Sequence, residues 1–237
     1  KYDPDTNRQD HNSDHTNTIT AFAISSDGKI AATGQRGRDA VVIVWCTRTM
    51  KSLATLRGHR RAVVQIAFSN DGKTVASAGA DDGHTVLVHN WQSESKQKIR
   101  TGQNLLLHLC FSGNNSMFVA AGKKCVYFFE SKGRSNARWR KRRAGIVSGS
   151  KVKGELERFT GVCFVDDEDD LKSKRVLVTV GTPTKQSGQI YEFDSSTKRL
   201  MAIHNVTSSP ILAIHSHKLL RTIAIGCVDG TVCVIDS

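Results

Sequence analysis

Three residues near the start of the chain are of the types that a nucleophilic hydrolase uses. His15, Thr33 and Asp39 supply an imidazole, a hydroxyl and a carboxylate, the groups that a Ser-His-Asp triad combines to activate an oxygen nucleophile. Such a nucleophile also needs donors beside it to stabilise the developing oxyanion. Thr33 falls in the middle of a predicted strand, a position that offers none. We therefore predict that the chain is not an enzyme.

The glycines and acidic residues do not form a cofactor or metal site. Glycines stand at predicted tight turns, where they supply a positive φ: Gly34, Gly37, Gly79, Gly83, Gly226 and Gly230. None belongs to a G-x-x-x-x-G-K-[ST] or G-x-G-x-x-G motif, so nucleotide binding has no support. The acidic run 166–170 lacks the spaced ligands of a calcium-binding loop. No cofactor is predicted.

The cysteines and histidines also predict no metal centre. No C-x-x-C pair occurs, and each cysteine lies in or beside an apolar, β-rich run, where a free thiol behaves as a small apolar group: Cys46, Cys110, Cys125, Cys163, Cys227 and Cys233. This pattern predicts a reduced, cytosolic chain without disulfides or zinc. His59 and His89 would chelate a metal only if they happened to face each other, so we predict none.

One segment is strongly basic. Between residues 132 and 153 the chain carries nine cations and no acid: Lys132, Arg134, Arg138, Arg140, Lys141, Arg142, Arg143, Lys151 and Lys153. The net charge of the whole chain is +12, which leaves +3 for the rest. A solvated surface is the ordinary explanation of a charge run. So many uncompensated charges repel one another, and we therefore expect a surface that contacts an acidic partner.

Length and composition indicate the class of protein to which these residues belong. A chain of 237 residues with 38% apolar and 24% charged residues predicts a globular domain rather than a disordered chain. No apolar run reaches the roughly 18 residues of a membrane-spanning helix, and the first residues show no secretory signal. The sequence begins without Met, so we expect it to be a piece of a longer protein.

The chain repeats itself about every 43 to 53 residues. Residues 23–29 align with residues 67–73 at a shift of 44, and the same shift relates His15 to His59 and Thr33 to Ser77. Further copies follow from Phe111, Phe164 and Leu212. Within each copy, short β-rich runs alternate with polar turns. Four strands every 40 to 45 residues is the pattern of a β-propeller blade.

These residues resemble the WD40 family, and more narrowly the echinoderm microtubule-associated protein-like family. The narrow resemblance rests on the strings Thr33-Gly34-Gln35, residues 57–61 before residues 67–69, Val88-His89-Asn90-Trp91, and residues 122–129. It implies an all-β propeller of about five four-stranded blades, at 16–57, 60–101, 104–146, 158–206 and 210–237. Trp45 is the only tryptophan at a third-strand end, so individual blades depart from the family pattern.

The resemblance also implies roles for individual residues. In a WD40 blade His15, Thr33, Asp39 and Trp45 would form a buried hydrogen-bond chain, a structural role that we prefer to a catalytic one. His59 and Ser77 would form a partial copy, because His89 stands where tryptophan belongs. Residues 1–12 could supply the outer strand that the last copy lacks and so close a single five-bladed domain. An incomplete ring taken from a larger propeller is the alternative that we favour.

Three functions remain open from the sequence. The family resemblance implies a cytoskeletal module that binds tubulin or microtubules in the cytoplasm, cilium or flagellum. A general WD40 scaffold for another protein complex is the alternative. Nucleic-acid binding is less favoured, because Trp139 is the only aromatic residue in the basic run. No membrane partner is expected.

Overall fold

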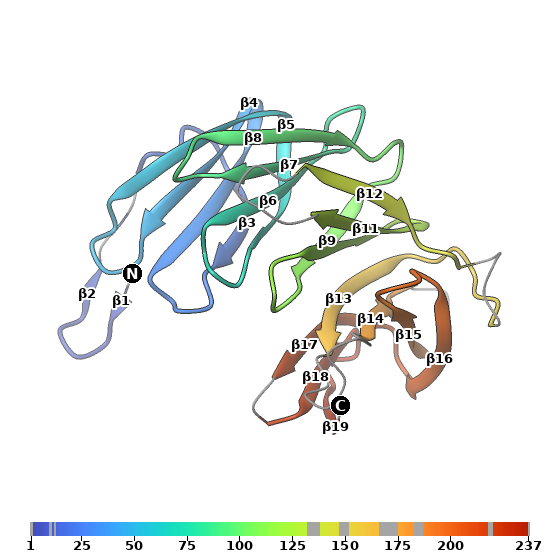
Figure 1. Cartoon of the computed structure of the whole chain (residues 1–237). Helices are drawn as coiled ribbons and strands as arrows, with labels where there is room; N and C mark the ends of the chain where they lie inside the picture. Colours follow the sequence, from blue (N-terminus) through green and yellow to red (C-terminus); the bar gives the residue numbers. More distant parts are fainter. Residues whose placement is uncertain are drawn as a thin grey trace. The chain divides into compact units, whose positions relative to one another are not determined.

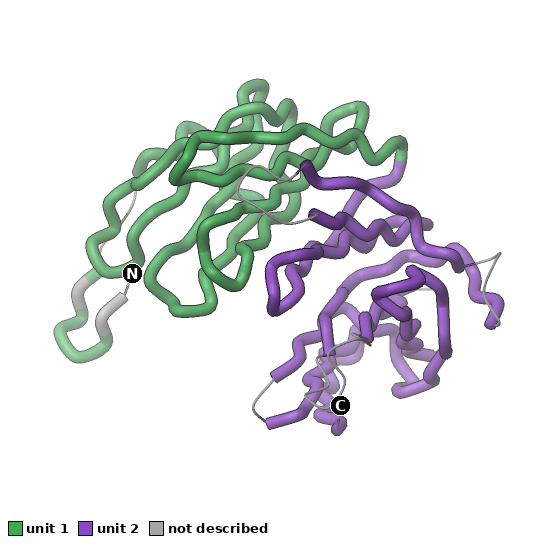
Figure 2. Tube along the Cα trace, in the orientation of Figure 1, with its two compact units in different colours: residues 1–103 green, residues 104–237 purple. Residues whose placement is uncertain are grey.

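The computed structural model describes residues 2–9, 11, 13–131, 138–146, 152–165, 175–182, 187–217 and 220–236. Its regular elements in these ranges are β-strands (Figure 1). The described residues contain no helix that is long and apolar enough to cross a membrane. The chain divides into two compact units, residues 1–103 and residues 104–237 (Figure 2). The acidic run at 166–170 lies outside the described residues.

Unit 1 contains a small hairpin and one six-stranded antiparallel sheet. The hairpin joins β1 (Tyr2–Asp3) to β2 (Arg8–Gln9). The sheet has the order β3-β4-β5-β6-β7-β8. Its strands are β3 (Ile19–Ile24), β4 (Ile30–Cys46), β5 (Ser52–Phe68), β6 (Thr74–Gly79), β7 (Thr85–Asn90) and β8 (Ser95–Arg100).

The two longest strands make this sheet equivalent to two four-stranded repeats. Thr47 N donates to Lys29 O at 3.0 Å, so the two ends of β4 lie side by side and β4 folds back on itself. The first half of β5 pairs with β4, whereas its second half pairs with β6. One repeat is therefore β3, the two arms of β4 and the first half of β5. The second half of β5 forms the other repeat with β6, β7 and β8.

A recurring polar turn joins the first two strands of the first three repeats. Ser25 Oγ donates to Asp27 Oδ1 at 2.6 Å, and Ser69 Oγ donates to Asp71 Oδ1 at the same distance. Ser112 and Asn114 make the equivalent contact in the third copy, at 2.8 Å. Side chains of this kind satisfy backbone groups that a tight turn leaves without partners. The repeated Ser-x-Asp/Asn string therefore fixes where these three hairpins reverse.

Unit 2 contains three antiparallel sheets. The first has the order β12-β11-β10-β9, with β9 (Leu106–Phe111), β10 (Met117–Gly122), β11 (Cys125–Ser131) and β12 (Trp139–Arg143). The second contains β13 (Phe159–Val165), β14 (Arg175–Val180), β15 (Gly188–Asp194) and β16 (Leu200–Thr207). The third contains only β17 (Ile211–His217), β18 (Thr222–Cys227) and β19 (Val232–Asp236).

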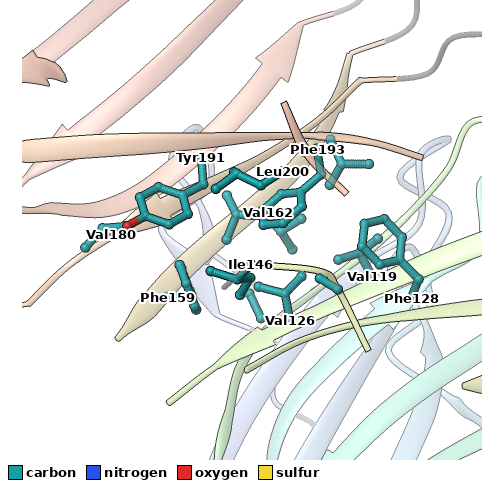
Figure 3. Packing of buried hydrophobic residues seen from close by; sticks show 14 of the residues in the cluster. Val119, Val126, Phe128, Ile146, Phe159, Val162, Val180, Tyr191, Phe193 and Leu200 are labelled. Atoms are coloured by element: carbon teal, nitrogen blue, oxygen red, sulfur yellow. The ribbon is translucent and has the colours of Figure 1, made fainter. Parts of the chain in front are cut away.

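An aromatic and aliphatic core packs between the first two sheets of unit 2 (Figure 3). Phe128 of β11 and Phe193 of β15 meet edge to face, with ring centroids 6.2 Å apart. Phe159 and Tyr191 pack in the same way at 5.5 Å. Each fully buried aromatic side chain contributes about 2–3 kcal/mol through removal of apolar surface from water. This core therefore fixes the strand that precedes the basic segment.

The predicted all-β repeat architecture is confirmed, with one difference in detail. Four copies of the repeat are complete, two of them within the six-stranded sheet and two as four-stranded sheets, whereas the described part of the fifth is three-stranded. In the described residues β1 and β2 pair with each other. Closure by residues 1–12 and the favoured alternative, an incomplete ring from a larger propeller, both stay predictions. All six cysteines are free thiols.

Candidate interaction surface

The structure brings two of the four residues in the first predicted hydrogen-bond chain together. His15 Nε2 lies 2.7 Å from Thr33 Oγ1, and His15 Nδ1 lies 2.8 Å from Gln35 Oε1. The amide oxygen can only accept, so Nδ1 donates to it. Asp39 is exposed and Trp45 is half-buried. Gln35, which the sequence reading missed, is therefore the second partner of this histidine.

The second copy buries a similar but longer polar set. His59 Nε2 lies 2.8 Å from Ser77 Oγ, and both residues are buried. Asp81, another missed residue, accepts hydrogen bonds from Thr85 N at 2.8 Å and from Thr85 Oγ1 at 2.6 Å. His89 is also buried, and among the described residues neither of its ring nitrogens has a hydrogen-bond partner.

Burial controls the ionisation of this set. It lowers the pKa of His59 to about 4, although nearby Asp81 opposes the shift. It also lowers the pKa of His89 to about 4, with the positive charge of Lys96 acting in the same direction. Burial alone would raise the pKa of Asp81, but the hydrogen bonds from Thr85 lower it below its usual value. At neutral pH the set is therefore two neutral imidazoles beside one carboxylate.

The basic segment supplies the edge strand of its sheet. β12 pairs with β11, and Arg142 stands opposite Phe128 while Arg140 stands opposite Glu130. The described cations of the segment are all exposed: Arg138, Arg140, Lys141, Arg142, Arg143 and Lys153. Lys132, Arg134 and Lys151 lie outside the described residues. The prediction that this stretch forms the outermost strand, with its charges facing solvent, is confirmed for the described residues.

The aromatic residue in the segment anchors it to the sheet. Trp139 is half-buried, and its ring centroid lies 5.0 Å from that of Phe118 and 5.9 Å from that of Phe111. Lys141 Nζ lies 5.0 Å from the centre of the Tyr127 ring, a cation–π contact. Trp139 and Lys141 alternate with Arg140 and Arg142, as successive residues of a strand point to opposite faces.

An ion pair between the buried Lys198 and the half-buried Glu130 lies beside Arg142 of the basic strand. Lys198, with 8% of its side chain exposed, places Nζ 2.5 Å from Glu130 Oε1. Lys198 Nζ also donates to the carbonyl oxygens of Ser195 and Ser196. Arg142 Nε lies 3.8 Å from the second Glu130 oxygen and is 70% exposed. Glu130 therefore joins the turn before β16 to the basic strand.

The chain after β12 is held by backbone hydrogen bonds. Gly145 N donates to Lys198 O at 2.9 Å, and Leu200 N donates to Gly145 O at 3.1 Å. Ala144 and Ile146 are buried in the core between the first two sheets of unit 2, and Ile146 is labelled in Figure 3. The cations of β12 consequently stand on a rigid backbone rather than on a loose loop.

The comparisons with known proteins bear on this arrangement. The family described as "WD domain, G-beta repeat" matches residues 8–46 and 50–88. The crystal structure of the Myceliophteria thermophila Cps50 (Swd1) β-propeller domain superposes with a TM-score of 0.71 at 15% identity, over 93% of this chain and 67% of that one. The chain carries WD40 repeats on a β-propeller fold. A WD40 propeller is generally a non-enzymatic scaffold for protein interaction.

Three sequence relatives carry names from cilia and centrioles. The human cilia- and flagella-associated protein 52 is 26% identical over an alignment of 221 residues, which covers 87% of this chain and 32% of that protein. The Euplotoides octocarinatus ciliary WD repeat-containing protein ctxp80 is 30% identical over 115 residues, 46% of this chain and 16% of that protein. Centriole proteome protein 16 of Chlamydomonas reinhardtii is 34% identical over 67 residues, 28% of this chain and 3% of that protein. The chain thus spans about a third or less of the length of each relative.

Proposed function

We propose that this chain is a cytoskeletal interaction module that binds tubulin or microtubules through the basic surface of β12. The observation that carries the proposal is the set of exposed cations held on one edge strand by Trp139 and Glu130. Edge strands of natural sheets often carry charged side chains that prevent uncontrolled pairing. Here the charge has a single sign, which favours an acidic partner.

Two further observations support a cytoskeletal partner. The relatives are named for cilia, flagella and centrioles, which are microtubule-based structures. The strings around residues 33–35, 57–61 and 122–129 resemble the echinoderm microtubule-associated protein-like family. The negative charge of the acidic tubulin tails is complementary to the positive charge of the surface. We accordingly propose the cytoplasm and the cilium or flagellum as the place of action.

The affinity must come from several weak contacts. An exposed ion pair contributes about 0.2–1 kcal/mol, so no single arginine or lysine of β12 would hold a partner alone. Four or five such contacts made together would give useful affinity. Because Lys141 and Arg143 alternate with Arg140 and Arg142, the surface offers charge on both faces of the strand.

A pelleting experiment with two forms of tubulin tests this function. The chain should pellet with intact microtubules and should lose most of its binding when the acidic tubulin tails are removed by proteolysis. Duplex DNA, added as competitor at equal charge, should release little of the bound chain. Equal binding to both forms of microtubule would contradict the proposal, and efficient release by DNA would favour nucleic-acid binding instead. Absence of any pelleting would favour a general WD40 scaffold.

A further inference from the structure

A second row of cations lies on unit 1, at the edge strand β8. Lys96, Lys98 and Arg100 are all exposed and alternate along this strand. They stand opposite His89, Leu87 and Thr85 of β7, respectively, so their side chains share one face of the sheet. Alternate residues of a strand are about 7 Å apart. The row is therefore a regular ladder of positive charge, which the sequence reading did not single out.

The row ends at a polar pocket. Arg60, Lys98 and Arg100 line a pocket of about 370 Å³ together with Asp81, Asp82, Gly83 and Thr85. The two carboxylates already have partners, because Asp81 accepts from Thr85 and Asp82 lies 2.7 Å from Arg61 Nη2. The three lining cations thus outnumber the acids at the pocket, and a carboxylate entering it would meet a favourable field.

The chain beneath the row is firmly packed. His59 is held by Ser77, and a Cβ on Gly58 would lie 2.9 Å from Leu87 Cδ1, so the 58–60 segment lies close over β7. Leu87 and Thr85 are both buried. The cations consequently project from a fixed surface, and binding them would cost little ordering of the backbone.

β8 is also an edge strand. In the part of the chain that the structure describes, β8 is the last strand of its sheet (Figure 1). An edge strand can pair with an added extended peptide through main-chain hydrogen bonds, while alternate side chains give specificity. Side chains of directly opposed residues on paired strands approach to about 5 Å. Acidic residues at every second position of an added strand would therefore lie beside Lys96, Lys98 and Arg100.

We propose that β8 and the Arg60 pocket form a docking site for an extended acidic segment of a protein partner, with acidic residues at alternate positions. Charge complementarity indicates an acidic occupant. The edge position of β8 favours a peptide, because a nucleic acid has no peptide backbone to pair with the strand. The site belongs to unit 1 and does not depend on tubulin binding at β12.

A labelled peptide provides the direct test. The probe is a fluorescein-labelled nonapeptide in which glutamate and threonine alternate, and binding to the full chain is followed by fluorescence anisotropy. We expect a peptide of the same composition with its glutamates in one block to bind at least about fivefold more weakly. N-methylation of alternate backbone nitrogens should weaken binding about tenfold, because it removes main-chain donors. Equal binding of all three peptides would overturn strand addition without requiring any protein variant.

Matched variants locate the site. Replacing Lys96, Lys98 and Arg100 with Gln should weaken binding of the alternating peptide about tenfold. The control variant Arg48→Gln, Lys51→Gln, Lys73→Gln removes the same charge from other exposed positions of unit 1 and should bind like the parent. Equal loss in both variants would reduce the effect to net charge and overturn the site. Displacement of the peptide by duplex DNA at lower charge concentration than by unlabelled peptide would also overturn it.

Discussion

His59 and Ser77 are joined across two strands by a 2.8 Å contact between Nε2 and Oγ, in a place where both side chains are buried. Gly79 faces the same ring, and a Cβ there would overlap it. Neither Nδ1 of His59 nor any ring nitrogen of His89 has a partner among the described residues. The buried polar set of this repeat is thus fixed in position, but some of its nitrogens lack a hydrogen-bond partner among the described residues. This makes the set sensitive to protonation.

The first prediction is that the stability of the chain falls in mild acid. The pKa of His59 and that of His89 are both about 4 in the folded chain, against about 6.5 in an unfolded one. The unfolded state therefore binds more protons between these values. The stabilising contribution of the two neutral rings is complete above pH 6.5 and is lost as the pH falls towards 4. Each ring accounts for about 3 kcal/mol of this loss.

Urea denaturation at several pH values checks this prediction. The free energy of unfolding should decrease steeply between pH 6.5 and 4, and His89→Phe should flatten this dependence. Asp81, Lys96 and Lys98 are the charged groups near the two rings. The control is His204→Gln, because His204 is exposed and pairs with Glu192. If the free energy of unfolding of His89→Phe depended on pH as that of the parent does, His89 would not contribute to the loss of stability in acid.

The repeat period in the sequence predicted the histidine and the hydroxyl of this polar set. A shift of 44 residues relates His15 to His59 and Thr33 to Ser77, and in each copy the structure joins the histidine to the hydroxyl. The same shift relates Asp39 to Gly83 and Gly37 to Asp81. The acid therefore stands two residues away from its expected position in the second copy, in a turn whose length sequence alone leaves open.

The repeat pattern does not predict contacts between sheets. Lys198 adopts a positive φ of 63° in the turn before β16, and that backbone bend brings its ammonium group to Glu130 of another sheet. A lysine in a polar turn is ordinarily exposed. Neither the spacing nor the composition of residues 194–198 distinguishes this lysine from a solvated one.

The second prediction concerns this ion pair. Glu130→Gln should destabilise the chain by about 3 kcal/mol, because it leaves the buried Lys198 ammonium without a counter-charge. Arg142→Gln should cost less than about 1 kcal/mol, since Arg142 contacts the same carboxylate from an exposed position. Chemical denaturation of both variants gives the comparison. The double variant Glu130→Gln, Lys198→Met should recover part of the loss, and an additive loss would show that the pair does not act as a unit.

The third prediction is an order of thiol reactivity. Hydrogen bonds from the Thr49 side chain and from the 48–49 backbone lower the pKa of Cys46, whereas burial raises the pKa of Cys125 to about 11 and that of Cys163 to about 12. The thiolate is the reactive form. Timed iodoacetamide labelling, followed by peptide mass spectrometry, should modify Cys46 first and the two buried thiols only after denaturation. Early labelling of Cys163 in the folded chain would contradict the packing around β13.

The last prediction separates a functional surface from solubilising charge. Replacing Arg140, Lys141, Arg142 and Arg143 together with Gln should weaken microtubule binding at least about tenfold, or about 1.4 kcal/mol. The variant should remain folded, because these side chains are exposed while Trp139 and the core beneath β11 are untouched.

The control for this variant removes four charges elsewhere. Lys29, Arg48, Lys51 and Lys73 are exposed residues of unit 1, and their replacement with Gln lowers the net charge by the same amount. Both variants are compared with the parent in pelleting at physiological salt, where charges separated by more than about 8 Å are largely screened. A selective loss in the β12 variant assigns binding to that strand. If it pellets as well as the parent, the charges of β12 only keep the chain soluble.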